Sequence, residues 1–147
     1  MNRILAVASA GGHWVQLMRL RPAFDGPQTT FVSTDRGYSE ALGRPVIQVV
    51  DANLDRKWML VCLFVQMAWL IIRHRPSIIL TTGAAPGFAA LSIGKLLGAK
   101  TVWIDSIANS EELSRSGRAA RRWADLWLTQ WPHLATERGP QYWGNVL

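Results

Sequence analysis

The residues with the clearest chemical potential stand in a short glycine turn, Ser9-Ala10-Gly11-Gly12-His13. Two adjacent glycines allow a sharp backbone turn and let a ligand approach the main chain closely. A helix that begins here presents free N–H groups and a partial positive charge, which suit a phosphate. His13 stands at that helix start and can exchange a proton near neutral pH. The turn therefore predicts a phosphate-binding and proton-transfer site, although an ordinary tight strand-to-helix turn explains the glycines equally well.

The stretches around this turn predict a strand before it and a helix after it. Ile4–Ala8 is a continuous apolar run, and His13–Leu20 has apolar residues at helical spacing. Later runs predict five further strands, at Thr29–Thr34, Val46–Val50, Ser77–Thr82, Thr101–Ile104 and Asp125–Thr129. Helices are expected at 57–74 and at Phe88–Leu97. Strands that alternate with helices predict an α/β fold, namely one Rossmann-like domain over residues 1–147 with a mainly parallel sheet.

Four chemically distinct segments follow predicted strands directly: His13 with its glycines, Asp35, the turn Gly83–Gly87, and Asp105. The carboxyl ends of parallel strands meet at one edge of a sheet, and the ligands of such sheets bind there. The sequence therefore predicts a site at this edge, for a ligand anywhere between a nucleotide and a sugar-lipid.

The composition indicates one compact domain with an anionic partner. A chain of 147 residues has room for one ordinary domain, and its 49% hydrophobic and 18% charged residues exclude a disordered chain. The net charge of +6 favours nucleic acid, anionic lipid or a phosphorylated ligand as the partner.

Cys62 is the single cysteine, which excludes a disulfide within the chain and fits a reducing compartment. Cysteines and histidines lack metal-ligand spacing, so we expect no metal and no cofactor, and we expect no signal peptide before the strand at Ile4.

The most apolar stretch is Trp58–Ile72, in which Gln66 is the only polar residue. A helix packed on one face of a sheet normally shows a polar stripe, so the outer side of this helix is predicted to face something apolar. The stretch reaches about 22 Å, which is short of the ~30 Å of a bilayer core. We expect the helix at 57–74 to lie in a membrane interface and to contact lipid through Lys57, Trp58, Trp69, Arg73 and Arg75. The alternatives are a helix buried between the sheet and a partner protein, and a true membrane span.

A series of motifs resembles a known family. In chain order they are Thr81-Thr82-Gly83-Ala84-Ala85-Pro86-Gly87, Lys95-Leu96-Leu97-Gly98-Ala99-Lys100, Asp105-Ser106, Ala124-Asp125-Leu126 and Gln130-Trp131-Pro132. They are similar to the membrane-anchoring, acceptor-binding subunit of two-subunit glycosyltransferases, a group that includes the dolichol-pathway UDP-N-acetylglucosamine transferase and bacterial exopolysaccharide and capsule counterparts. Gly11-Gly12-His13 resembles the same family and the N-terminal half of the N-acetylglucosaminyltransferase that forms lipid II. The resemblance covers almost the whole chain.

The resemblance implies the N-terminal half of a GT-B glycosyltransferase that is split over two chains. This chain would bind the membrane and a polyprenyl-diphosphate-linked sugar acceptor, at the cytoplasmic face of the cell inner membrane. A separate UDP-sugar-binding subunit would complete a heterodimeric, inverting hexosyltransferase of polysaccharide or lipid-linked oligosaccharide biosynthesis. The length agrees, because a whole GT-B enzyme needs two Rossmann domains and 147 residues hold one.

The resemblance also implies roles for single residues near the glycine turn. Gly11, Gly12 and the helix start would hold the diphosphate of the acceptor. His13 would be a candidate general base that removes the proton of the acceptor hydroxyl, or the group that orients this hydroxyl. Asp105 would be a competing base or the group that orients His13, and a cap for the loop that follows is its plain structural alternative.

Two further regions receive roles from the same resemblance. Gly83, Pro86 and Gly87 would shape the acceptor cleft, unless they serve only the turn. The tail at 131–147 would contact the partner chain through Trp131, Trp143, Val146 and Leu147. Arginines 115, 118 and 122 share one face of a predicted helix, which would bind lipid phosphate or simply face solvent.

Other functions remain open beside this one. Eukaryotic relatives carry an N-terminal transmembrane helix and this sequence shows none, so membrane attachment would depend on the apolar helix. The main alternative is a non-catalytic membrane anchor that recruits and enhances a separate glycosyltransferase. A nucleic-acid module would carry aromatic and basic residues together on an exposed sheet, whereas here the basic residues bracket an apolar helix, so we expect no nucleic-acid partner. A self-sufficient nucleotide-binding protein would need the full G-x-G-x-x-G spacing, which the sequence lacks.

Overall fold

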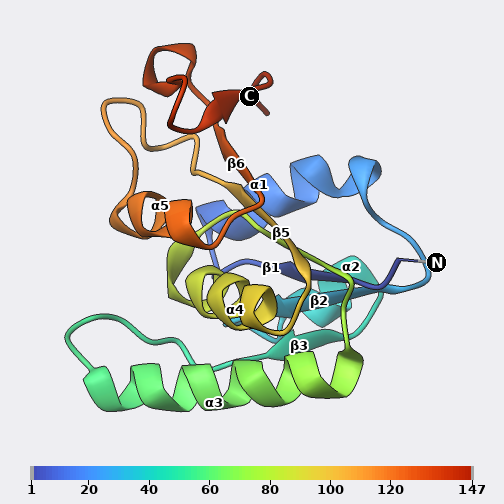
Figure 1. The fold of residues 1–147 in the computed structure, drawn as a ribbon. Helices are drawn as coiled ribbons and strands as arrows, with labels where there is room; N and C mark the ends of the chain where they lie inside the picture. Colours follow the sequence, from blue (N-terminus) through green and yellow to red (C-terminus); the bar gives the residue numbers. More distant parts are fainter. Residues whose placement is uncertain (1, 147) are drawn as a thin grey trace.

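The computed structural model describes residues 2–146. Within that range it contains a seven-stranded sheet in the order β3-β2-β1-β4-β5-β6-β7, and every neighbouring pair is parallel (Figure 1). The strands are β1 (Ile4–Val7), β2 (Thr29–Ser33), β3 (Val46–Gln48), β4 (Ile78–Thr81), β5 (Lys100–Ile104), β6 (Leu126–Thr129) and β7 (Gln141–Tyr142). The predicted α/β domain with a mainly parallel sheet is confirmed.

The central strand β1 explains why its residues form one continuous apolar run. Ile4 is in register with Thr29 of β2 and with Ile78 of β4, so β1 has a partner on both sides. The side chains of Leu5, Ala6 and Val7 are completely buried. Successive side chains of a strand point to opposite faces of the sheet, so both faces of β1 must be covered by helices.

Helices cover both faces. On one face lie α1 (Gly12–Leu20) and the short α2 (Tyr38–Leu42), and Trp14 and Leu17 of α1 pack against Phe31 of β2. On the other face α3 (Lys57–His74) lies beside α4 (Ala84–Leu96), and α5 (Arg115–Ala119) lies beside α4 (Figure 1). The larger core lies between α3, α4 and the sheet and includes Leu5, Val32, Leu63, Met67, Ile79 and Ala90. Three short 3₁₀ helices complete the described chain, η1 (Arg21–Ala23), η2 (Ala120–Arg122) and η3 (Pro132–Leu134).

Some elements differ from the sequence prediction for local reasons. α4 begins at Ala84 and not at Phe88, because Pro86 lies in the first turn of the helix, where its missing N–H is not needed. The sequence predicts neither α2 nor β7, which are five and two residues long. The arginine-rich segment does not form one helix, since α5 ends at Ala119 and Arg122 lies in the 3₁₀ helix that follows.

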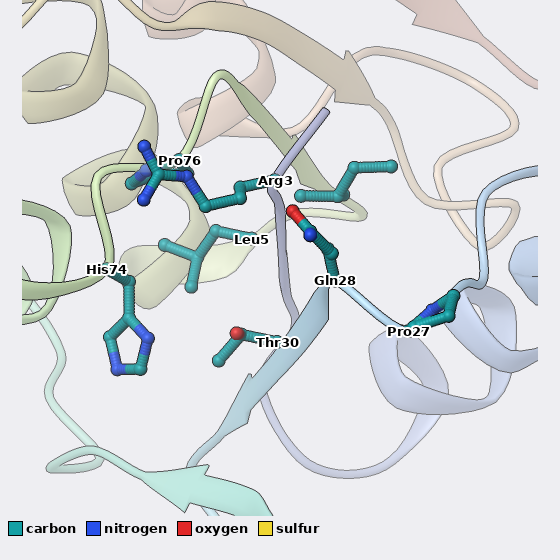
Figure 2. Close-up of a pocket in the computed structure, with 8 residues that line it drawn as sticks. Arg3, Leu5, Pro27, Gln28, Thr30, His74 and Pro76 are labelled. Atoms are coloured by element: carbon teal, nitrogen blue, oxygen red, sulfur yellow. The ribbon is translucent and has the colours of Figure 1, made fainter. Parts of the chain in front are cut away.

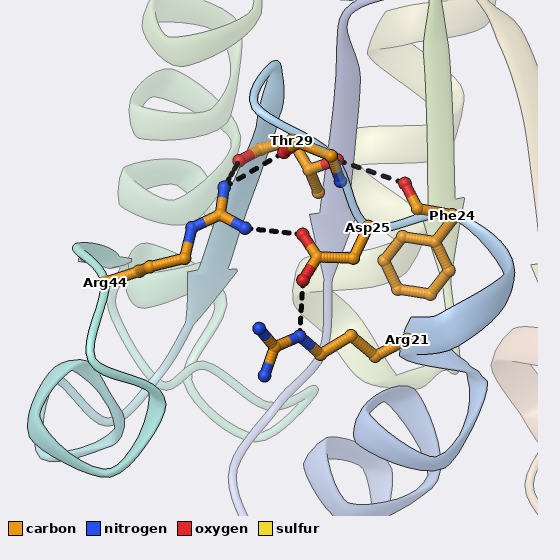
Figure 3. Close-up of polar contacts among 6 residues, drawn as sticks. Arg21, Phe24, Asp25, Thr29 and Arg44 are labelled. Atoms are coloured by element: carbon orange, nitrogen blue, oxygen red, sulfur yellow. Dashed lines mark hydrogen bonds and ion pairs between the residues drawn. The ribbon is translucent and has the colours of Figure 1, made fainter.

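An ion-pair cluster fixes the connection between α1 and β2 (Figure 3). The Asp25 carboxylate accepts hydrogen bonds from Arg21 and from Arg44, each at 2.5 Å. Arg44 also donates to the carbonyl of Thr29 at 2.8 Å and lies 5.3 Å from the centre of the Phe31 ring. Burial alone raises the pKa of the Asp25 carboxyl, but the hydrogen bonds and charges of the two arginines outweigh it and hold the pKa below its ordinary value of 3.8.

Candidate functional site

The glycine turn joins β1 to α1 at the carboxyl edge of the sheet. Gly11 directly precedes α1 and has a φ of 82°, a conformation that favours glycine. Two hydrogen bonds from the main chain hold the turn, from Ala10 to the Thr34 hydroxyl at 3.0 Å and from Gly11 to the Tyr38 hydroxyl at 2.9 Å. The Tyr38 ring stacks on Trp14 of α1 with 4.4 Å between the ring centres. The turn is therefore fixed from two sides by residues that follow β2.

The start of α1 is open to a ligand. In the part of the chain that the structure describes, no side chain caps this helix, so the N–H groups of its first turn keep their capacity to donate. Gly12 is exposed, and a Cβ placed on it would meet no atom within 4 Å. Open space beside donor groups and a positive helix end is the environment that an anionic group requires.

The half-buried side chain of His13 is held by the turn that follows β4. Its Nδ1 lies 2.9 Å from the carbonyl oxygen of Thr82, and the Thr82 hydroxyl donates to the His13 carbonyl at 2.7 Å. A carbonyl oxygen only accepts, so Nδ1 carries the proton in this contact and the neutral ring keeps Nε2 as an acceptor. The ring also lies against Gly83, where a Cβ would come within 3.0 Å of the ring carbon Cε1.

Asp105 lies directly after β5, but its side chain is directed into the protein and the residue is 1% exposed. The carboxylate accepts hydrogen bonds from the hydroxyl and the N–H of Ser114 at 2.6 and 3.1 Å, from the Trp103 indole at 3.2 Å and from Asn109 at 3.4 Å. Ser114 in turn caps the N-terminus of α5. These contacts make Asp105 the anchor of the loop between β5 and α5.

Gln16 is a positioning residue that the sequence analysis does not single out. It is 2% exposed; its amide nitrogen donates to the Asp105 carbonyl at 3.0 Å, and its amide oxygen accepts from the Ile107 N–H at 2.9 Å. The pair of hydrogen bonds ties α1 to the loop after β5. A glutamine between the apolar residues of a buried helix face is a signal for such a polar partner, since buried polar groups are hydrogen-bonded.

The turn Gly83–Gly87 contributes unequally to the site. Gly83 has a φ of 126° and gives the His13 ring its space. A Cβ on Gly87 would lie 2.0 Å from the Thr81 hydroxyl, so the close packing of α4 on β4 requires this glycine. Pro86 is buried in the first turn of α4. Gly83 therefore borders His13, while the other two predicted cleft residues have a packing role.

The outer face of α3, defined by Trp58, Val61, Val65, Trp69 and Ile72, is apolar and 60–74% exposed. On its other side α3 buries Leu63, Met67, Leu70 and Ile71 in the core. Exposed basic residues stand at both ends of the helix, Arg56 and Lys57 before the outer face and Arg73 and Arg75 after it. Among residues 2–146, α3 is the one helix whose length and composition would allow it to cross a membrane, with 22% of it buried.

The four predicted partner residues of the tail differ in what they contact. The Trp131 indole donates to the Ile107 carbonyl at 2.9 Å, and the Val146 main chain bonds Gln130 and Arg19 at 3.1 and 2.7 Å. Trp143 follows the edge strand β7 and is 68% exposed. Leu147 lies outside the described residues. The Trp143 indole donates to the Gln141 side chain at 3.0 Å, and Trp143 is the most exposed aromatic side chain of the described tail.

Two surface hollows lie apart from the glycine turn. One of about 240 Å³ lies at the opposite, amino edge of the sheet, between the starts of β1 and β2 and the end of α3 (Figure 2). Arg3, Gln28, Thr30 and His74 are among its lining residues. Another, of about 450 Å³, lies along α3 and is lined by apolar residues of α3 and by Ile93 of α4. The candidate site is therefore defined by its donors and by His13, and not by the depth of a cavity.

Sequence comparison identifies relatives of this chain. A family model described as "Oligosaccharide biosynthesis protein Alg14 like" matches residues 46–146. The UDP-N-acetylglucosamine transferase subunit ALG14 of Mus musculus is 35% identical over an alignment of 89 residues, and the match covers 53% of this chain and 39% of the mouse protein. The chain therefore spans about two fifths of the length of that curated relative. These matches confirm the family resemblance that the motifs indicate.

Solved structures of MurG and of a UDP-N-acetylglucosamine 2-epimerase share this fold. Acinetobacter baumannii MurG covers 95% of this chain with a TM-score of 0.78 and 10% identity, over 45% of its own length. UDP-N-acetylglucosamine 2-epimerase from Rickettsia bellii covers 99% with a TM-score of 0.72 and 12% identity, again over 45% of its own length. At such identities the likeness concerns the fold alone, which is that of the N-terminal GT-B domain of MurG.

Proposed function

Since this chain belongs to the family of Alg14-like oligosaccharide biosynthesis proteins, we propose that it is one subunit of a two-chain, inverting glycosyltransferase. It binds the membrane and a polyprenyl-diphosphate-linked sugar acceptor, and a separate UDP-sugar-binding chain completes the enzyme. Two findings support this proposal. The mouse relative is named as a transferase subunit, and the fold of this chain matches less than half of MurG.

The placement of His13 beside the open start of α1 is the observation that supports the acceptor site most strongly. In our proposal the acceptor diphosphate lies at Gly11 and Gly12 and binds the free N–H groups of the first turn of α1, and the acceptor hydroxyl lies at Nε2 of His13. Nε2 takes the hydroxyl proton while the oxygen bonds to the sugar carbon and UDP leaves. Asp105 is assigned to the support of the loop after β5 and not to proton transfer, because its carboxylate is buried and already accepts four hydrogen bonds.

The outer face of α3 is the proposed membrane contact. Eighteen residues of helix reach about 27 Å, but a spanning helix is surrounded by lipid, whereas α3 has one side in the protein core. We therefore place α3 along the membrane surface, with Trp58 and Trp69 in the interface and the basic residues at its ends against lipid phosphates. This arrangement supports peripheral attachment, and the cytoplasmic face of the inner membrane is the location that the family resemblance implies.

A transfer assay tests the acceptor site. Membranes that contain this chain and its candidate partner chain receive a UDP-sugar and a polyprenyl-diphosphate-linked acceptor. His13→Ala is expected to lower the rate at least 100-fold, the usual contribution of a general base, while the two chains still assemble. His74→Ala, at the amino edge of the sheet, is the matched control and is expected to keep the rate within twofold. A His13→Ala pair with full activity would exclude the assigned base.

The same assay separates the enzyme from an anchor. Neither chain alone is expected to transfer sugar. Full activity of the partner chain alone would leave this chain a recruiting anchor.

Asp105→Ala is expected to lower the free energy of unfolding by about 2–3 kcal/mol, because the donors of Ser114 and Trp103 lose their acceptor, and to lower transfer only in proportion to the loss of folded protein.

A further inference from the structure

We propose that Thr82 and Gly83 are positioning residues that hold His13 in its Nδ1–H tautomer, so that Nε2 faces the open start of α1 without a proton. The catalytic consequence of this tautomer rests on the proposed function, whereas the tautomer itself can be measured without a transfer assay. Both residues lie in the turn after β4, which is far from His13 in the sequence and adjacent to it in the fold.

Two hydrogen bonds hold the histidine. Nδ1 donates to the Thr82 carbonyl at 2.9 Å, which fixes one ring nitrogen. The Thr82 hydroxyl donates to the His13 carbonyl at 2.7 Å, which fixes the main chain of the same residue. Thr82 is completely buried, so both hydrogen bonds are shielded from competing water. Main chain and ring of His13 are therefore both tied to Thr82.

Gly83 supplies the space that this arrangement requires. A Cβ there would lie 3.0 Å from Cε1 and 3.1 Å from Nδ1 of His13, which is too close for the ring to stay where it is. The φ of 126° at Gly83 also disfavours any other residue. The Gly83 N–H donates to the Thr81 hydroxyl at 3.1 Å, which keeps the turn in this conformation.

The tautomer decides what the ring can do. A neutral imidazole has one donor and one acceptor nitrogen, and the hydrogen bond of one nitrogen determines the state of the other. With Nδ1–H on the Thr82 carbonyl, Nε2 is the acceptor that a hydroxyl proton needs. The other tautomer would place a donor toward the acceptor hydroxyl and would remove the base.

His133 is expected to have the opposite tautomer and therefore serves as an internal reference. Its Nε2 is within hydrogen-bond distance of the Ser110 carbonyl, so the same logic predicts an Nε2–H tautomer there. His13 and His133, two of the three histidines of the chain, should therefore differ in nuclear magnetic resonance spectra. In long-range ¹H–¹⁵N correlation of the full chain labelled with ¹⁵N-histidine, at about pH 8.5 where imidazoles are neutral, His13 is expected to show a protonated Nδ1 and His133 a protonated Nε2.

Variants of Thr82 test the cause. Thr82→Val keeps the carbonyl that accepts from Nδ1 but removes the hydroxyl that holds the His13 main chain, so the ring is held less firmly at that carbonyl. We therefore expect the ratio of Nδ1–H to Nε2–H at His13 to fall by up to about fivefold, the equivalent of one hydrogen bond. Thr82→Ser retains the hydroxyl and should restore the wild-type ratio, whereas His133 stays unchanged in both variants. In the transfer assay Thr82→Val should lower kcat and leave the KM for the acceptor unchanged, and Thr82→Ser should restore kcat.

The outcomes separate the two proposals. A wild-type His13 that is mainly protonated at Nε2, or a tautomer ratio that is the same in Thr82→Val as in wild type, would overturn the positioning role whatever the transfer assay shows. An Nδ1–H tautomer together with full transfer by His13→Ala would instead overturn the catalytic base, while the tautomer assignment would stand.

Discussion

At the scale of single residues, two glycines that look alike in the sequence have different surroundings. Gly12 begins α1, and a Cβ placed on it meets open space. Gly87 lies in the first turn of α4, where a Cβ would meet the Thr81 hydroxyl at 2.0 Å. Close packing therefore requires a glycine at position 87, whereas packing does not require one at position 12. A substitution at Gly12 is thus the better test of ligand binding.

Substitution of these glycines should separate packing from binding. Gly87→Ala is expected to lower the free energy of unfolding by about 1–3 kcal/mol, because α4 or Thr81 must move. Gly12→Ala is expected to stay within about 0.5 kcal/mol of wild type and to raise the KM for the diphosphate-linked acceptor, because the methyl group crowds the N–H donors. Urea unfolding and the transfer assay measure the two effects. A greater loss of stability in Gly12→Ala than in Gly87→Ala would contradict this assignment.

At the scale of elements, the sequence predicts most strands because their apolar and β-branched runs are local signals. The runs at Thr29–Thr34 and Thr101–Ile104 agree closely with β2 and β5. α2 and β7 are too short to show a period, so their existence depends on contacts made after folding, such as the pairing of β7 with β6. The start of α4 is missed because its small residues are typical of a turn as well as of a helix that packs closely on a strand.

The apolar outer face of α3 predicts binding to vesicles. Trp69→Glu is expected to weaken binding to vesicles with anionic lipid at least tenfold, because it removes apolar burial and adds a repelled charge. Val15→Glu is the matched control, since Val15 is also apolar and exposed but lies on α1, on the opposite face of the sheet. Vesicle sedimentation measures both, with circular dichroism to verify folding. Equal loss in the two variants would contradict a specific contact through α3.

The Asp25 cluster predicts a stability that depends on pH. The pKa of Asp25 is lower in the folded chain than its ordinary 3.8, so the unfolded state binds its proton first as the pH falls. The stabilisation is therefore fully present above about pH 4 and is lost as the pH falls through the lower folded pKa. Asp25→Asn should lower the free energy of unfolding by about 1–2 kcal/mol at neutral pH, with a smaller difference near pH 3. Urea unfolding across this pH range measures the difference in stability. Asp51→Asn, at an exposed site, is the control. A difference in stability that is constant with pH would exclude the ion pairs as its source.

At the scale of the whole molecule, the candidate site is assembled from three strand-to-helix turns. The sequence places His13, Gly83 and Asp105 at one edge of the sheet, and the structure agrees with the strand order that this requires. The sequence alone cannot predict that Thr82 holds His13 or that Gln16 bonds the loop after β5. The residues of these pairs are 69 and 89 positions apart, and their contacts depend on packing. The topology is thus readable from local patterns, whereas the hydrogen bonds that orient the site are not.

The tail provides the last prediction, which concerns assembly of the two chains. Trp131 and Val146 bond distant segments of the domain, whereas Trp143 bonds only the nearby Gln141 among the contacts described and is 68% exposed beside β7. Exposed tryptophans are favoured as interface anchors, and truncation of such a residue commonly costs a tenfold or greater loss of affinity. Trp143→Ala should therefore weaken association with the candidate partner chain at least tenfold, measured by calorimetry in detergent, without a change in unfolding midpoint. Leu96→Ala, at a 74% exposed position of α4, should leave association unchanged; if both variants bind the partner as wild type does, the interface lies elsewhere than on this tail.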